Sequence, residues 1–161
     1  MNLAALAPAW LAIFLLLVMA ASAVEDIWRM EIEDWLSGAV AAGAIVAAIA
    51  AGPTLGLWQN TLLALSVLAV GWWLFVRGAM GGGDVKLLTA AALWFDLSSG
   101  WKMLVAVAVV GGLVTIVMIA VRHLPWPATA RTRVVSLRRD EGIPYGVAIA
   151  AGVGLSLSML R

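Results

Sequence analysis

Long runs of apolar residues, separated by short polar stretches, dominate this chain and predict helices that cross a membrane. The runs lack the alternation of polar and apolar positions that is typical of membrane β-barrel strands. The fold class we expect is therefore an all-α integral membrane protein, a bundle of about six transmembrane helices. The six expected spans are residues 3–24, 35–51, 58–76, 84–96, 103–121 and 142–160.

Three features interrupt this pattern. Pro8 is expected to kink the first span or to mark its first turns. The sequence AGPTLG at 51–56 combines glycine with proline, which favours a turn between the second and third spans. The fourth span is short for a full crossing, so we expect it to begin inside the protein. We interpret the first span as retained and not as a cleaved signal, because it is long and no cleavage-type site with a soluble domain follows it.

The composition agrees with a membrane protein and excludes an ordinary soluble domain. The chain has 161 residues, of which 64% are hydrophobic and 12% charged, and its mean hydropathy is +1.04. We interpret residues 1–161 as one membrane-embedded domain. The absence of cysteine excludes disulfides and thiolate zinc sites. Most tryptophans, Trp94 among them, lie near the ends of expected spans and predict an aromatic belt at the membrane interfaces.

The distribution of Lys and Arg predicts the orientation of the bundle, because positive residues in short loops stay in the cytoplasm. With six spans, only Lys102 and Arg161 fall on the outer face, so both termini are expected outside. Asp26 and Asp84 then lie at similar depth on the cytoplasmic side. The positive residues expected on that side are Arg29, Arg77, Lys86, Arg122, Arg131, Arg133, Arg138 and Arg139.

Two carboxylates that meet in apolar surroundings cannot both ionise easily, so they share one proton. In an aspartyl protease the ionised partner deprotonates water, while the protonated partner polarises the carbonyl of the scissile bond. The glycines at 81–83 precede Asp84, and their lack of side chains would let a substrate backbone or a neighbouring helix come close to it. The sequence therefore predicts a catalytic pair formed by Asp26 and Asp84.

Three stretches resemble the type IV prepilin peptidases, a family of membrane aspartyl proteases with a Gly-x-Gly-Asp signature. GGGDVKLL at 81–88 is similar to that signature as prepilin peptidases carry it. DIWRMEIED at 26–34 resembles the pattern Asp-(five residues)-Ile-Pro-Asn, with Asp26 and Ile32 in place and Glu33-Asp34 instead of Pro-Asn. GIPYGVAIAAG at 142–152 resembles the family's last helix, which commonly opens with Pro-Tyr-Gly.

The resemblance covers nearly the whole chain, whose length is similar to that of the small prepilin peptidases of Flp/Tad pilus systems (CpaA/TadV type). It implies an aspartic endopeptidase of the bacterial inner membrane, with Asp26 and Asp84 as catalytic residues. The substrate would be a Flp-type pilin precursor, cut at the cytoplasmic face between a basic leader and a hydrophobic helix. Membrane lipid and other pilus-assembly proteins are further expected partners, and no cofactor, metal or nucleic acid is expected.

Other interpretations of the same residues stay open. Asp84 could serve only as a helix N-cap, and Asp26 could be one more solvated charge. Lys86 is expected to extend to the lipid headgroups or to add positive potential near the site. A small transporter or channel subunit would use Asp84 and Lys86 in an ion path, and a catalytically silent pilus-assembly factor would use neither. A nucleic-acid-binding role for the basic segment 122–140 lacks an aromatic platform.

Residues 25–34 contain five acids and one base, on the face where positive residues are favoured. Beside a catalytic Asp26, the other acids could attract the Lys and Arg of a leader peptide, or they could simply form a solvated loop. We expect the substrate to be bound by Gly81, Gly82, Gly83, Glu31, Glu33 and Asp34.

Overall fold

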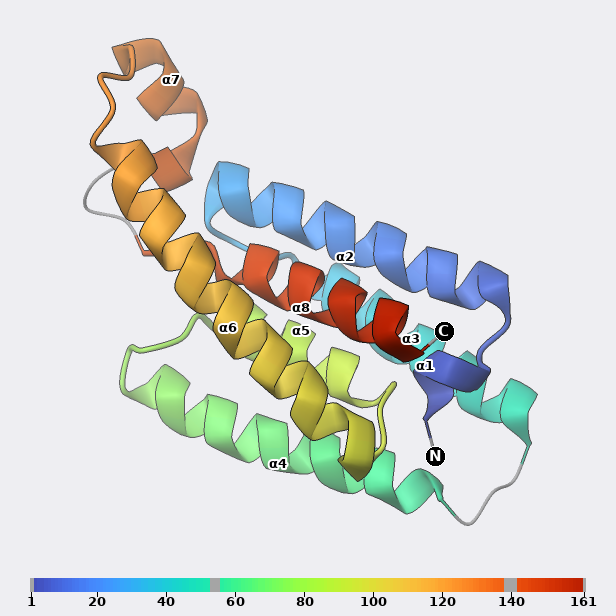
Figure 1. Ribbon diagram of the computed structural model, residues 1–161. Coiled ribbons are helices and arrows are strands. Elements are labelled where there is room, and N and C mark those ends of the chain that lie inside the picture. Colours follow the sequence, from blue (N-terminus) through green and yellow to red (C-terminus); the bar gives the residue numbers. More distant parts are fainter. Residues whose placement is uncertain (1, 53–55, 138–141, 161) are drawn as a thin grey trace.

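The structure, a computed structural model, describes residues 2–52, 56–137 and 142–160, and these residues form helices and no strand (Figure 1). The expected break at 51–56 falls largely on residues outside this described part, as do Arg138 and Arg139. The helices are α1 (Leu3–Leu6), α2 (Ala9–Arg29), α3 (Asp34–Ala51), α4 (Leu57–Val76), α5 (Gly82–Ala92), α6 (Leu97–Arg122), α7 (Ala128–Arg133), the 3₁₀ helix η1 (Val135–Leu137) and α8 (Tyr145–Leu160).

Four helices, α2, α3, α4 and α6, are long and apolar enough to cross a membrane. This finding confirms the expected all-α integral membrane bundle. Two of the six expected spans are shorter: α8 has 16 residues and α5 has 11. A crossing needs about 20 residues, so α5 is too short to pass through a bilayer on its own.

The ends of the helices differ from the expected spans for local reasons. Pro8 separates α1 from α2, because its extended backbone (ψ 150°) precedes the first turn of α2. At its other end α2 continues to Arg29, which places Asp26 inside the helix. The expected fourth span, 84–96, ends early at Ala92. Helix α6 begins at Leu97, before the expected start at 103, because the Asp96 side chain accepts the Ser99 N–H and caps it.

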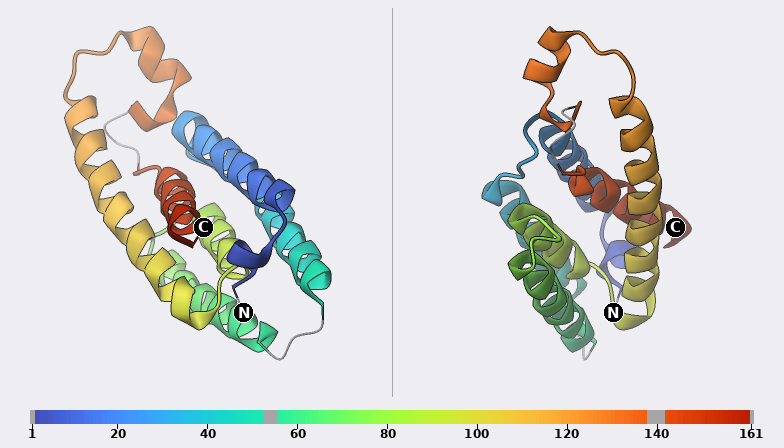
Figure 2. Two further views of the ribbon diagram at one scale, coloured as in Figure 1. Left: turned by 45° about the vertical axis from the view of Figure 1, so that its right-hand side comes forward. Right: turned by 90° about the vertical axis from the view of Figure 1, so that its left-hand side faces the viewer.

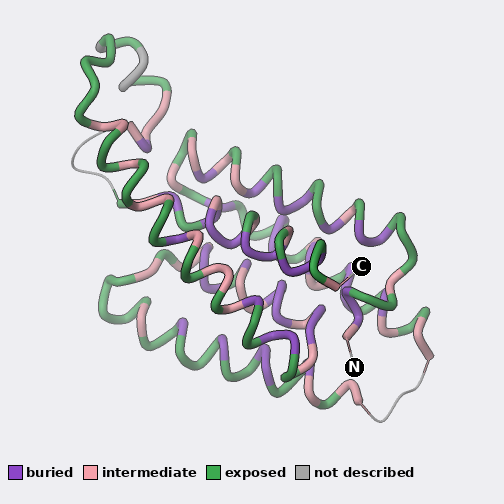
Figure 3. The backbone as a smooth tube through the Cα atoms, viewed as in Figure 1, coloured by how far each residue is buried: buried purple, intermediate pink, exposed green. Residues whose placement is uncertain are grey.

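The short helix α5 lies at the centre of the bundle and is its most buried helix (Figures 1 and 3). It packs against α3, α4 and α8. The chain that leaves α5 also stays inside, where Trp94 and Phe95 are fully buried. The Trp94 ring N–H donates to the Val40 carbonyl at 3.0 Å, and its own carbonyl accepts the Ala4 N–H at 2.9 Å. The expected belt position of Trp94 was therefore wrong: this residue, which follows α5, is bonded through its ring to α3 and through its backbone carbonyl to α1.

Helix α6 lies on the outside of the bundle and makes most of its contacts with α8 (Figure 2). A bare backbone at Gly152 of α8 allows this contact, because a Cβ there would lie 2.5 Å from Cγ2 and 2.7 Å from Cα of Val107. Small residues bring membrane helices close in this way, and the gain comes from van der Waals contact. The α6–α8 pair therefore depends on a glycine that the hydropathy pattern does not mark.

Replacing Gly152 by alanine should lower the stability of the bundle, because the Val107 backbone cannot move aside without shifting α6. We expect a loss of about 1–3 kcal/mol, the usual cost of overpacking. The control is Gly112→Ala, since a Cβ at that position meets nothing within 4 Å. The midpoint of unfolding in detergent should fall for Gly152→Ala only, and equal midpoints for the two variants would contradict this account of the helix pair.

Candidate functional site

Asp26 lies in the last turn of α2 and is buried, with only 4% of its surface exposed. The helix ends four residues later at Met30, whose left-handed backbone (φ 55°, ψ 28°) is unusual for a residue with a side chain. The Met30 N–H donates to the Asp26 carbonyl at 3.0 Å and closes this last turn. The chain therefore reverses direction directly beside the carboxylate.

The reversed chain brings Ile32 between the first turns of α5 and α8. A Cβ at Gly83 would lie 3.1 Å from the Ile32 carbonyl oxygen, and a Cβ at Gly146 would lie 3.0 Å from the Ile32 side chain. Ile32 is buried. The glycines before Asp84 were expected to let a substrate backbone or a neighbouring helix come close. At Gly83 this place is taken by the Ile32 segment of the same chain.

Asp84 occupies the third position of α5, and Gly81 is the N-cap residue. Asp84 is therefore not the N-cap residue of α5, as one interpretation of the sequence had it. The Gly81 backbone N–H donates to the Asp84 carboxylate, which is half of a capping box. The carboxylate is buried, and its Oδ1 atom has no hydrogen-bond partner among the described residues. One oxygen thus helps to begin α5, while the other can still accept or donate.

Asp26 is held from the far end of the sequence. The Gly146 N–H in the first turn of α8 donates to Asp26 Oδ2 at 2.6 Å. A Cβ at position 146 would lie 2.9 Å from that oxygen, so the contact needs glycine. Because Asp26 is buried and hydrogen-bonded, the interpretation of this residue as a solvated charge is wrong.

The two carboxylates lie where two cavities meet. The first, which we call the Glu31 cavity, has a volume of about 260 Å³. The second, which we call the Tyr145 cavity, has a volume of about 310 Å³. Both cavities are lined by Asp26, Met30, Gly81 and Asp84; the first adds Glu31, Ile32, Gly82 and Gly83, and the second adds Gly78, Ala79, Met80, Gly142, Ile143 and Tyr145.

The environment of Asp84 favours its protonated form. This residue belongs to α5 and lies outside the four spanning helices. Burial, reinforced by the negative charge of Asp26, raises the pKa of the Asp84 carboxyl to about 7, although the hydrogen bond from Gly81 acts in the opposite direction. A protonated and an ionised carboxyl in one cavity can together activate water and polarise a carbonyl group.

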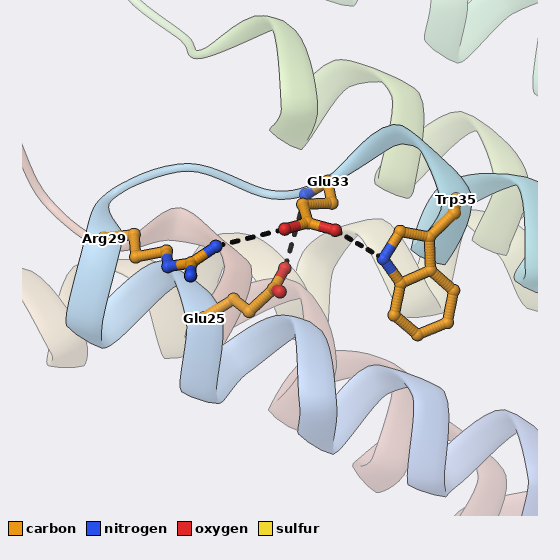
Figure 4. A network of polar contacts seen from close by, with 4 residues as sticks. All are labelled: Glu25, Arg29, Glu33 and Trp35. Carbon is orange, nitrogen blue, oxygen red and sulfur yellow. Dashed lines mark hydrogen bonds and ion pairs between the residues drawn. The ribbon is translucent and has the colours of Figure 1, made fainter.

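The loop between α2 and α3 is held by a network of polar side chains (Figure 4). Glu33 accepts a hydrogen bond from Arg29 at 3.0 Å and another from the Trp35 ring at 2.7 Å. Its backbone N–H donates to Glu25 at 3.3 Å. The next residue, Asp34, binds Lys86 Nζ at 2.7 Å, so this lysine ties α3 to α5. Its expected contact with the lipid headgroups stays a prediction.

The residues expected to bind substrate therefore fall into two groups. Gly81, Gly82, Gly83 and Glu31 line the Glu31 cavity beside the two aspartates. Glu33 and Asp34 do not line it and are engaged in ion pairs. Gly146 was not among the residues expected in the site, although it belongs to the Pro-Tyr-Gly stretch that resembles the last helix of the family. A glycine at the buried start of a helix, where another group can come close to the backbone, was the signal in the sequence that could have revealed this contact.

Groups of three or more His, Asp or Glu that could hold a metal ion are absent from the part of the chain that the structure describes. The ionisable residues that line the two cavities are Asp26, Glu31, Asp84 and Tyr145.

Comparison with known proteins identifies the family of this chain. The model of the type IV leader peptidase family matches residues 13–120, which is more than half of the chain and includes Asp26 and Asp84. Neither a curated protein nor a solved structure matches the chain. This chain belongs to the type IV leader peptidase family and is thus a membrane protease for pilin precursors, with a role in pilus assembly.

Proposed function

We propose that the protein is an aspartic endopeptidase in which Asp26 and Asp84 are the catalytic residues. The observation that carries this proposal is the meeting of two buried carboxylates at the junction of two open cavities. A charge of this kind inside a membrane protein is costly and marks function. The family match supports peptidase chemistry, and the paired carboxylates supply its acid and base.

The roles of the two aspartates follow from their surroundings. Asp84 carries the shared proton, because burial and the neighbouring charge favour its neutral form. Asp26, which accepts the Gly146 N–H, is the ionised partner. Asp26 takes a proton from water as the hydroxyl adds to the carbonyl carbon, while Asp84 gives its proton to the carbonyl oxygen. Return of a proton to the leaving nitrogen then breaks the C–N bond.

For the substrate we propose a Flp-type pilin precursor, cut at the cytoplasmic face of the bacterial inner membrane, with both termini of the protease on the other side. The support is the cluster of basic residues at the end of the bundle that holds the aspartates. Arg29 borders the α2–α3 loop, Lys86 binds Asp34, and Arg122 donates to the Gly142 carbonyl beside the Tyr145 cavity. Other pilus-assembly proteins could meet the enzyme at this face.

Replacing either aspartate by asparagine should abolish processing, because each variant lacks one half of the acid–base pair. We expect a loss of about 10²–10⁴-fold in rate for each variant. The assay follows the size of a coexpressed pilin precursor on a gel, at matched levels of the protease.

The control for this experiment is Asp96→Asn, which removes the same charge near the start of α6 and keeps a residue that caps helices well. It should process the precursor normally. Full processing by Asp26→Asn or by Asp84→Asn would contradict the catalytic pair. If the wild-type protein itself leaves the precursor intact, a silent assembly factor or a transporter becomes the better interpretation.

The rate of cleavage should fall as the pH rises through about 7, because Asp84 then loses the proton that the pair shares. At lower pH the rate should fall again when the second carboxyl is also protonated. The measurement is kcat/KM against pH for the purified enzyme in detergent. A rate that stays constant from pH 6 to about 9 would exclude Asp84 as the acid.

Replacing Glu31 by glutamine should slow the cleavage of a precursor with a basic leader, because Glu31 is the additional acid in the Glu31 cavity. The expected loss is about fivefold, the size of one solvent-accessible charge interaction, and added salt should reduce it. A leader without lysine or arginine should be cut equally by both enzymes. Equal slowing of the two leaders would show that Glu31 acts on the structure and not on leader charge.

A further inference from the structure

An apolar groove runs along α4, beside the two cavities at the aspartates. We call it the α4 groove. It has a volume of about 200 Å³. One face of α4 forms its wall, because the lining positions recur every three or four residues. These positions are Leu63, Ser66, Val67, Val70, Gly71 and Leu74.

Helix α5 forms the floor of this groove and α6 its opposite wall. Leu88 of α5 and Leu104 of α6 line it. The two walls meet at one end only, where a Cβ at Gly100 would overlap the Leu63 side chain. From that point the axes of α4 and α6 diverge toward the end of the bundle that holds the aspartates (Figures 1 and 2). Val70 remains 60% exposed, so the groove is open along the membrane-facing side of α4.

Met80 joins the groove to the aspartates, since it lines both the α4 groove and the Tyr145 cavity. The Tyr145 cavity in turn shares Asp26 and Asp84 with the Glu31 cavity. The three spaces therefore form one series. Glu31 lies at one end of this series, Asp26 and Asp84 lie in the middle, and the α4 groove, which faces the bilayer, lies at the other end.

We propose that the α4 groove binds the hydrophobic helix of the substrate, the part that follows the cleaved bond. This inference rests on the proposed function. It also fixes a direction: the positively charged leader lies toward Glu31, the cleaved bond lies between Asp26 and Asp84, and the apolar helix passes Met80 into the groove. The acidic Glu31 at one end complements a basic leader, and the apolar lining of the α4 groove at the other end fits an apolar helix.

The dimensions agree with such an occupant. The lining positions on α4 run from Leu63 to Leu74, a rise of about 17 Å at 1.5 Å per residue, which matches about three turns of a bound helix. The contact would be made sideways, from within the bilayer. Ser66 is the polar side chain on the α4 wall, so binding comes from apolar contact along the helix and not from a pattern of hydrogen bonds.

Crosslinking tests the location directly, because the chain has no cysteine of its own. One cysteine is placed at Val70, in the groove, or at Leu65, which is similarly exposed and does not line it. The two side chains project about 140° apart around α4. Each variant also carries Asp84→Asn, and the substrate is a pilin precursor with one cysteine in its hydrophobic helix. We expect a disulfide-linked complex from Val70→Cys and none from Leu65→Cys.

Kinetics give a second, independent readout. Val70→Trp should fill the groove and raise KM for the whole precursor about tenfold with kcat little changed, since it removes binding that ground state and transition state share. Leu65→Trp should change neither value. A short peptide that contains the leader and the cleaved bond, without the helix, should be cut equally by Val70→Trp and by wild type.

The outcomes separate the two proposals. If the wild type cleaves the precursor and neither Val70 variant differs from its Leu65 control, the groove holds lipid only and this inference is wrong. Slower cleavage of the short peptide by Val70→Trp would place the effect at the aspartates and overturn it as well. If the wild type cleaves nothing, the proposed function fails, while a crosslink specific to Val70→Cys would still support binding of the helix.

Discussion

The hydrogen bond from the Gly146 N–H to the Asp26 carboxylate is the contact on which the rest of the site depends. A buried carboxylate is stable only when donors replace the water that it has lost. Here the donor comes from a residue 120 positions away in the sequence. The bond therefore fixes the start of α8 against the end of α2, and the absence of a side chain at Gly146 leaves room for both Asp26 and Ile32.

The loop after Asp26 shows how this chain forms a turn without the proline and asparagine of the family pattern. Proline would restrict the backbone by itself. In this protein Glu33 instead accepts hydrogen bonds from Arg29 and Trp35, and Asp34 is bound to Lys86 of α5. Side-chain contacts thus replace backbone restriction, and the same acids that hold the turn are withdrawn from the cavity. This division explains why Glu31 is the acid left beside Asp26.

Hydropathy and the family motifs predicted the helical bundle and the two aspartates, because lipid imposes long apolar runs and the motifs mark the carboxylates. Details that depend on contacts between distant residues could not be predicted. A run of apolar residues does not reveal that Trp94 is buried and not at the interface. It also does not reveal that α5 ends at Ala92, or that Asp96 caps the start of the next helix, α6. The partners of Glu33 and Asp34 likewise appear only after folding.

The buried pair Trp94 and Phe95 has a consequence for the membrane itself. The proposed reaction at the aspartates consumes water, so it requires that water reach their cavities from one side of the bilayer. Beyond them the core of α5 is apolar, with Leu87, Ala90 and Ala91 followed by the two aromatic rings. An apolar layer of this kind is a costly path for a charge. The proposed site could then hold water at its carboxylates without opening a path for ions across the membrane.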